Sequence, residues 1–208
     1  MKAKVAIIGS GNIGWAIRKL LKDDYEVKSG DLRDGMDANS KSQVKEFLKD
    51  QSAVISAGPY AVNKNIADVA SDMGIGYFDL TEDVSTTEYV KSKKSNSVLI
   101  PQCGLAPGAI NICAAEMITE FDEVNEVLMR VGALPKYTTN EMSYYLSWST
   151  NGLINEYCNE ADVIYEGKKQ KVMPLEGMEK LIIEGKSYEA FNTSGGCATM
   201  CDTYEGKV

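Results

Sequence analysis

The strongest constraint on the fold is the segment Gly9-Ser10-Gly11-Asn12-Ile13-Gly14. It follows a short β-branched run within residues 2–9, typical of a buried parallel strand, and precedes a segment (13–21) with apolar residues at helical spacing. The first glycine permits a tight turn, the second lets a pyrophosphate approach the backbone, and the third allows close packing of helix on strand. The helix N-terminus offers free N–H groups to the phosphates. We therefore predict a dinucleotide-binding β-α-β unit in which the cofactor contacts Gly9, Ser10, Gly11, Asn12, Ile13 and Gly14.

The N-terminal half of the chain alternates between strand-like and helix-like periods. Strands are expected at 2–9, 25–31, 52–58, 75–80 and 97–102, and helices at 13–21, 40–50, 63–74 and 86–94. Strands that alternate with helices predict right-handed crossovers and a doubly wound parallel sheet. The predicted class is α/β, with an NAD(P)-binding Rossmann domain over residues 1–105.

The regular alternation of strand-like and helix-like segments ends between residues 103 and 110. A helix is expected at 111–118, longer strand-like segments at 124–135 and 141–149, and a hairpin at 161–175 that turns at Glu166-Gly167-Lys168. These segments predict a second, α+β domain over residues 106–208, with a mixed or antiparallel sheet for substrate binding and dimerisation.

Composition argues against several classes of function. The chain has 208 residues and a net charge of −8, which disfavours nucleic acid as a partner because phosphate-binding proteins concentrate Lys and Arg. The N-terminal apolar run is broken at Gly9, too early for a signal peptide or a membrane helix. Five cysteines without framework spacing indicate reduced thiols and a cytoplasmic protein. With no histidine, the pair Cys197 and Cys201 does not predict a metal site.

The end of the second predicted strand bears on cofactor choice. An acidic side chain there, Asp31, can accept hydrogen bonds from both adenine-ribose hydroxyls and would repel a 2′-phosphate. Arg33 can cover the adenine or pair with a 2′-phosphate, or it can be a solvated surface charge. We expect NAD, with NADP as the alternative.

Other candidate residues follow later strands, because ligands of open α/β sheets bind beyond the carboxyl ends of the strands. Ala57, Gly58 and Pro59 are placed near the nicotinamide ribose, and Tyr60 on the substrate side. Asp79 is a candidate for holding a substrate amine, and Cys103 for a polar contact to substrate or for packing as a small hydrophobe.

Two further carboxyl groups, Glu82 and Asp83, precede a predicted helix. They could attract an amine, but helix capping and favourable charge in the first helical turn explain such residues equally simply. We favour the second interpretation. Without histidine, proton transfer falls to Asp, Glu, Lys, Tyr, Cys or water.

The segments GSGNIG, SAGPY, YFDLTED, CGLAPGAIN, VGALP and YYLSWSTNGLINEY, followed by the hairpin ADVIYEGK, together resemble the saccharopine dehydrogenase and lysine dehydrogenase family over nearly the whole chain. The resemblance implies a homodimer that transfers hydride between a nicotinamide cofactor and the C–N bond of an amino-acid substrate. It also implies that substrate lies near Tyr60, Asp79 and Cys103, with Thr193 and Ser194 as further polar contacts.

This chain departs from the family in its length. Members of the family continue into a segment whose basic residues hold substrate carboxylates, so the resemblance implies a chain truncated at its C-terminus. Three hypotheses stay open: a lysine or saccharopine dehydrogenase with Asp79, Tyr60 and Cys103 at its catalytic centre, an NAD(P)-binding fragment or regulator without catalysis, and an enzyme similar to carboxynorspermidine synthase.

Overall fold

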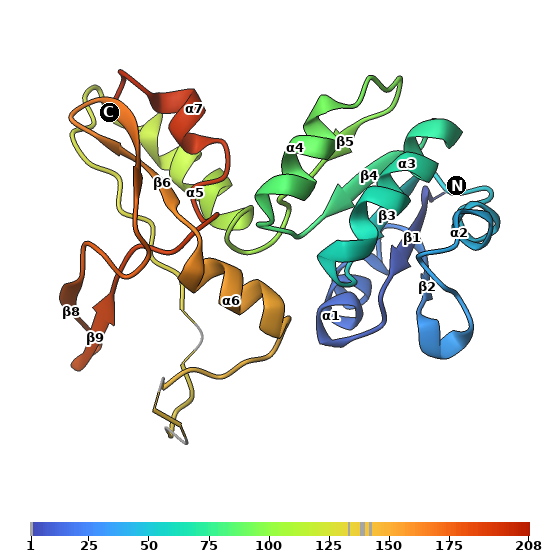
Figure 1. The fold of residues 1–208 in the computed structure, drawn as a ribbon, viewed down its shortest axis with the longest axis horizontal. Helices are drawn as coiled ribbons and strands as arrows, with labels where there is room; N and C mark the ends of the chain where they lie inside the picture. Colours follow the sequence, from blue (N-terminus) through green and yellow to red (C-terminus); the bar gives the residue numbers. More distant parts are fainter. Residues whose placement is uncertain (1, 133, 138–139, 142) are drawn as a thin grey trace. The chain divides into compact units, whose positions relative to one another are not determined.

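The computed structural model describes residues 2–132, 134–137, 140–141 and 143–208. The chain divides into two compact units, Met1–Gly104 and Leu105–Val208, and each is described here by itself. Figure 1 shows both units in colours that follow the sequence.

The first unit is built around a parallel five-stranded sheet in the order β2-β1-β3-β4-β5. Its strands are β1 (Lys4–Ile8), β2 (Glu26–Gly30), β3 (Ala53–Ser56), β4 (Gly76–Asp79) and β5 (Leu99–Ile100). Its helices are α1 (Asn12–Leu21), α2 (Lys41–Phe47), α3 (Asn63–Met73) and α4 (Val84–Ser92), with short 3-10 turns at η1 (Leu32–Asp34) and η2 (Tyr60–Val62). This architecture confirms the predicted doubly wound α/β fold.

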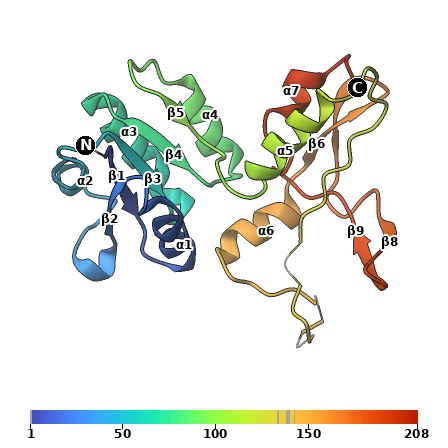
Figure 2. The same cartoon turned by 180° about the vertical axis from the view of Figure 1, so that it is seen from behind.

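The strand order dictates which face each helix covers. The chain moves from β1 to β2 in one direction and from β2 through β5 in the other, and a right-handed crossover changes face when this direction reverses. Helix α1 therefore covers one face, and α2, α3 and α4 lie side by side on the other (Figures 1 and 2). The reversal creates a switch point between β1 and β3, where ligands of such sheets bind.

The main core lies between the sheet and these three helices. Val44 and Leu48 belong to the α2 region, Ile66 to α3, and Tyr77 to β4, and all four are fully buried. Each such side chain contributes roughly 1.5–3 kcal/mol by leaving water. The opposite face is thinner, because Gly14 is the only buried residue of α1. The close approach of Gly14 to Gly9 fixes the loop that joins β1 to α1.

The described residues of the second unit form three helices and two separate antiparallel hairpins. The helices are α5 (Ala109–Ile118), α6 (Thr150–Cys158) and α7 (Met200–Tyr204), and the strands are β6 (Ala161–Tyr165), β7 (Lys168–Val172), β8 (Glu179–Ile183) and β9 (Lys186–Ala190). The β6–β7 hairpin confirms the prediction at 161–175. Its turn residues Glu166 (φ 51°) and Gly167 (φ 74°) are both left-handed, as a two-residue type I′ turn requires.

The strands predicted at 124–135 and 141–149 are wrong for the described residues, which contain no strand in either segment. Two residues of these segments, Ala133 and Met142, lie outside the described residues. Ala133 is also part of the VGALP motif. The described parts of both segments pair with no other strand, and residues of high β-propensity alone do not form a sheet. Helix α6 and the β8–β9 hairpin were not predicted, although Glu184-Gly185 repeats the turn dipeptide of the first hairpin.

Candidate functional site

The glycine loop, residues 9–14 between β1 and α1, is tightly packed at its first and last glycines, whereas its middle glycine has free space beside it. A Cβ at Gly9 would lie 2.7 Å from the carbonyl carbon of Ala57, and Gly9 has a φ of +106°. A Cβ at Gly14 would overlap the carbonyl oxygen of Gly9. A Cβ at Gly11, in contrast, would meet no atom within 4 Å. The three glycines therefore differ in role: two allow close backbone packing, and the middle one leaves its face accessible.

The same loop presents the N-terminus of α1. The helix begins at Asn12 with Gly11 as its N-cap, and no side chain caps it. Its first turn contains no acidic residue. The first N–H groups and the positive end of the helix dipole are thus available to an anion, which is the arrangement that binds phosphate groups.

Asp31, directly after β2, closes one side of this loop. Its Oδ2 accepts a hydrogen bond from the Ser10 amide at 2.9 Å, and its Oδ1 accepts one from Arg33 Nε at 3.0 Å. The hydrogen bonds from Arg33 and Ser10 hold the pKa of Asp31 well below its ordinary value. A permanent negative charge therefore stands at the position expected to contact the adenine ribose. Arg33 is largely exposed and covers this carboxylate.

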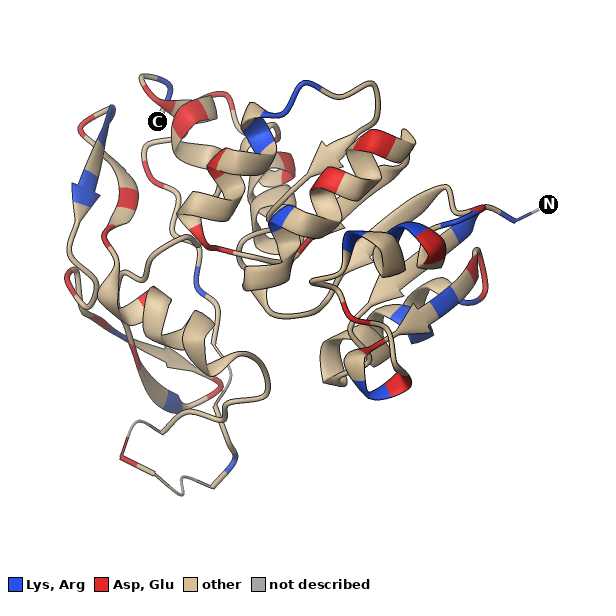
Figure 3. Cartoon of the chain, turned by 45° about the vertical axis from the view of Figure 1, so that its right-hand side comes forward, with Lys and Arg blue, Asp and Glu red and all other residues tan. Residues whose placement is uncertain are grey.

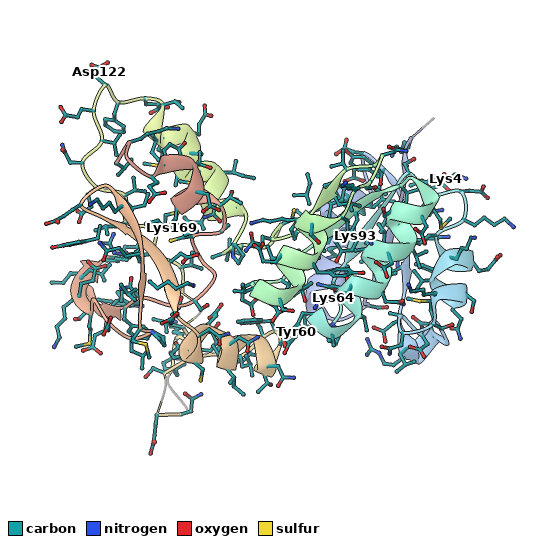
Figure 4. The ribbon with its side chains drawn as sticks, turned by 45° about the horizontal axis from the view of Figure 1, so that its top comes forward. Lys4, Tyr60, Lys64, Lys93, Asp122 and Lys169 are labelled. Atoms are coloured by element: carbon teal, nitrogen blue, oxygen red, sulfur yellow. The ribbon has the colours of Figure 1, made fainter. Side chains whose placement is uncertain are left out.

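The segment after β3 lies against the glycine loop. The Ala57 amide donates to the Ile8 carbonyl at 2.7 Å, so the backbone of residues 57 and 58 runs beside the end of β1. Pro59 is exposed and precedes Tyr60, the first residue of η2, which Figure 4 labels. The structure thus brings Ala57 and Gly58 next to Gly9 at the switch point of the sheet.

Asp79, at the end of β4, is fully buried and fully hydrogen-bonded. Its carboxylate accepts from the Tyr77 hydroxyl at 2.8 Å, the Thr81 amide at 2.9 Å and the Gln102 amide at 3.2 Å. Burial raises its pKa, and these hydrogen bonds partly offset that effect. In this arrangement Asp79 fastens the loops that follow β4 and β5 and presents no surface to a substrate.

A second polar pair lies beside this carboxylate. The Ser56 hydroxyl donates to Asn63 Oδ1 at 2.7 Å, and both residues are buried. The Tyr77 hydroxyl lies 3.3 Å from the Asn63 carbonyl oxygen. Side chains from β3, α3 and β4 thereby form one network under the carboxyl edge of the sheet, and this network holds the edge in a fixed shape.

Glu82, for which the sequence favoured a role in the first turn of a helix, is a buried carboxylate just before α4. It is 8% exposed, and among the residues that the structure describes no lysine or arginine forms an ion pair with it. Lys64, labelled in Figure 4, reaches the start of α4 but donates to Ser85 Oγ at 2.8 Å. Burial raises the pKa of Glu82, a hydrogen bond from its own amide offsets part of this rise, and the charges of Asp83 and Asp79 add to it.

Asp83 behaves as expected of a capping residue. Its Oδ2 accepts from the Thr86 amide at 2.7 Å, which makes it the N-cap of α4. Glu82 and Asp83 are adjacent in the sequence but differ in the structure. The Asp83 carboxylate caps α4, whereas the Glu82 carboxylate has no ion pair with a lysine or arginine among the described residues.

Cys103 and the pair Thr193 and Ser194 fall in different units. The Cys103 amide donates to the Asp79 carbonyl at 2.7 Å, and desolvation followed by the charge of Asp79 raises the pKa of its thiol to about 11. Thr193 is partly buried and Ser194 is buried, and the Ser194 amide donates to the Glu156 carbonyl of α6 at 3.0 Å. Cys103 is therefore a neutral thiol at the edge of the first unit.

The described residues contain no group of three or more His, Cys, Asp or Glu side chains arranged to hold a metal ion. Every helix in the same residues is too short or too polar to cross a lipid bilayer. Basic and acidic residues are interspersed within each unit, as Figure 3 shows.

Comparison with known proteins identifies the second half of the chain. Residues 104–205 match the family model of the saccharopine dehydrogenase C-terminal domain. The chain belongs to the saccharopine dehydrogenase family. The match begins next to the boundary between the two units, so it covers the part of the chain whose sheet was hardest to predict.

Curated relatives from this family align with both units. The chain is 25% identical over 193 residues to the Saccharomyces cerevisiae saccharopine dehydrogenase [NADP(+), L-glutamate-forming], covering 85% of this chain and 41% of that protein. It is 23% identical over 195 residues to the mouse mitochondrial alpha-aminoadipic semialdehyde synthase, covering 80% and 21%. The chain thus spans less than half the length of these relatives.

A solved saccharopine dehydrogenase shares the fold. The apo, L-Glu-forming enzyme from Saccharomyces cerevisiae superposes with a TM-score of 0.65 at 17% sequence identity, covering 92% of this chain and 50% of the other. The fold of this chain is therefore similar to that of this enzyme.

Proposed function

We propose that this chain is an oxidoreductase that binds a nicotinamide dinucleotide on the glycine loop and acts on the C–N bond of an amino acid. The observation that carries the proposal is the open face of Gly11, at an uncapped helix N-terminus, between two glycines that backbone packing requires. A purely structural turn has no need for a glycine at the open position. A pyrophosphate does, because its oxygens must reach the backbone N–H groups.

Asp31 supports NAD over NADP. Its carboxylate is ionised throughout the physiological range, and it faces the site where an adenine ribose would lie. A 2′-phosphate would meet this charge directly, whereas a 2′-hydroxyl would donate to it. Arg33 offsets part of the charge, so NADP binds more weakly rather than not at all. The yeast relative is named for NADP(+), which makes cofactor preference a point on which this chain is expected to differ.

The residues present fit such a cofactor. When bound, it would supply or accept the hydride, while the backbone of Ala57 and Gly58 would line its nicotinamide ribose. The network of Ser56, Asn63 and Asp79 would keep this edge rigid, which is what orientation of a reacting carbon demands.

Glu82 is the group proposed to hold the substrate amine. A buried carboxylate without a cation is unstable as an anion, and an ammonium group would supply the missing charge. The pKa of Glu82 is raised above its ordinary value, which is the direction that favours proton exchange between a carboxyl group and an amine. The printed names of the relatives concern saccharopine and aminoadipic semialdehyde, so lysine and saccharopine-like adducts are the substrate class to test.

The proposal is tested by calorimetric titration of the purified chain with NADH and NADPH. We expect saturable binding of NADH with a higher affinity than that of NADPH. We expect Asp31→Ala to lower the affinity for NADH and to reduce the difference in affinity between the two cofactors. Asp24→Ala changes the same residue type at an exposed position between α1 and β2 and serves as the matched control. Absence of binding to either cofactor would refute the proposal.

Turnover assays with lysine and saccharopine follow from a positive titration. Reduction of the cofactor by either substrate supports the oxidoreductase assignment. Binding without turnover supports the second hypothesis, a cofactor-binding protein of this family without catalysis, since the chain spans less than half of its enzymatic relatives.

A further inference from the structure

The guanidinium group of Arg33 contacts both oxygens of the carboxylate that is expected to meet the adenine ribose. Arg33 Nε donates to Asp31 Oδ1 at 3.0 Å, and Arg33 Nη2 donates to Asp31 Oδ2 over a longer distance of 3.5 Å. The side chain of Arg33 is 72% exposed, whereas that of Asp31 is 19% exposed. A mobile, solvated cation therefore covers a carboxylate that is largely enclosed.

Backbone amides supply the remaining contacts of this carboxylate. The Ser10 amide donates to Asp31 Oδ2 at 2.9 Å, and the Arg33 amide donates to Asp31 Oδ1 at 3.1 Å. An ionised carboxylate offers about four lone-pair sites, two on each oxygen. The two amides and the two guanidinium contacts use these sites, so a ribose hydroxyl can bond to Asp31 only by replacing one of them.

The backbone contacts are fixed, whereas the guanidinium contacts are not. The Asp34 and Met36 amides both donate to the Asp31 carbonyl, at 2.9 and 3.1 Å, and Met36 is buried. This turn holds Asp31 in place when the side chain of Arg33 moves. An ion pair with one partner so exposed is weak, because solvent screens it and the long side chain loses freedom on pairing. The guanidinium group is therefore the part that a ligand can displace.

Displacement of the guanidinium group opens one acceptor site on each oxygen of Asp31. The 2′- and 3′-hydroxyls of an adenine ribose can donate one hydrogen bond to each oxygen, so the diol replaces what the guanidinium supplied. The released guanidinium has a second use if the ribose carries a 2′-phosphate, because its planar N–H groups pair with phosphate oxygens. One side chain thus acts in opposite directions on the two cofactors.

We propose that Arg33 determines the cofactor preference of this site. It competes with the adenine ribose for Asp31 and thereby weakens the binding of NADH, and after release it pairs with a 2′-phosphate and thereby strengthens the binding of NADPH. The inference rests on the function proposed above. It differs from a general attraction between Arg33 and the phosphates, or from packing of Arg33 over the adenine, since either of these would strengthen the binding of both cofactors.

The experiment is calorimetric titration of the wild type and of Arg33→Ala with NADH and NADPH. We expect the affinity for NADH to rise about two- to fivefold, which is the factor that an exposed ion pair contributes. We expect the affinity for NADPH to fall about tenfold, because a charge-assisted contact to phosphate is lost. Arg18→Ala removes the same charge from an exposed position of α1 and should leave the ratio of the two affinities unchanged.

A double substitution separates the two effects of Arg33. In an Asp31→Ala background the ion pair is already absent, so the further change Arg33→Ala should no longer raise the affinity for NADH. It should still lower the affinity for NADPH, because the contact between the guanidinium and the 2′-phosphate does not need Asp31.

Three results would overturn the proposal. Arg33→Ala may not lower the affinity for NADH or leave it unchanged, and the gain in NADH affinity may not persist when Asp31 is absent. Failure of both the wild type and Arg33→Ala to bind either cofactor would overturn the proposed function itself. That failure is distinguishable from the other two, in which the cofactors bind but Arg33 does not compete with the ribose.

Discussion

Two alanine substitutions in the glycine loop separate its structural from its binding function. In Gly14→Ala, the new methyl group would overlap the carbonyl oxygen of Gly9, a backbone atom that no side-chain rotation can move. Overpacking of this kind costs about 1–3 kcal/mol, and the better helix propensity of alanine returns roughly 0.5–1 kcal/mol. Because the obstacle is backbone, we place the net loss in the free energy of unfolding near ~2 kcal/mol.

In Gly11→Ala, the methyl group meets no atom within 4 Å. The position is the N-cap of α1, where replacing glycine by alanine costs about 0.5 kcal/mol. A methyl group there stands where the pyrophosphate should approach the backbone, so we expect the dissociation constant for NADH to rise at least about tenfold, equivalent to roughly 1.4 kcal/mol.

Circular dichroism melts and calorimetry with NADH measure the two effects. For a unit of this size, ~2 kcal/mol corresponds to a midpoint lower by roughly 8–16 °C for Gly14→Ala, against roughly 2–4 °C for Gly11→Ala. Gly132→Ala, at another open glycine in the second unit, should change neither quantity. A Gly11→Ala protein that binds NADH like the wild type, or a Gly14→Ala protein that melts like it, would refute this reading of the loop.

Three further substitutions test the rest of the first unit. Asp79→Ala leaves the Thr81 and Gln102 amides without an acceptor, while the Tyr77 hydroxyl keeps the Asn63 carbonyl, and it should lower the free energy of unfolding by about 2 kcal/mol or more in urea titrations, whereas Asp79→Asn should keep most of that stability. Desolvation raises the pKa of Asp68, but hydrogen bonds from Lys41, Lys93 and Tyr89 prevail and lower it to about 2. A lowered pKa contributes stability that is present above the unfolded value of 3.8 and is lost as pH falls toward 2. As pH falls through this range, the free energy of unfolding of Asp68→Asn should therefore drop by about 1 kcal/mol less than that of the wild type, a value that allows for solvent screening. Glu82→Gln should raise the KM for the amine substrate roughly tenfold while NADH affinity stays unchanged, and an unaltered KM would remove Glu82 from the site.

Sequence alone predicted the first unit because its signals are local. The glycine loop, the buried β1 run and the helical pattern of α1 are contiguous, and the alternation of periods determines the layers of a parallel sheet. The order of the strands, β2-β1-β3-β4-β5, came from the structure. The Asp83 cap of α4 was likewise readable, since an N-cap and its amide lie three residues apart.

The second unit was harder because its signals are not local. Residues 124–132 are rich in valine and other apolar residues typical of a strand, but only a neighbouring strand makes a ladder, and the sequence does not reveal one. Helix α6 carried one readable signal, the Ser149 cap, whose Oγ accepts from the Gly152 amide at 3.2 Å. The apolar residues of the preceding segment YYLSWS favoured the prediction of a strand instead.

The roles of Asp79 and Glu82 show most clearly what a sequence leaves open. Both carboxylates follow β4, three residues apart, and composition gives no reason to treat them differently. The difference arises from Gln102, whose amide reaches Asp79 from 23 residues away and completes its hydrogen bonding. Glu82 receives no such donor from β5 and is buried without a cation. A buried carboxylate that accepts hydrogen bonds from three neighbouring groups holds a fold together, whereas one buried without a cation has free energy to gain from an ammonium group, and we therefore propose Glu82 over Asp79 for meeting the substrate amine.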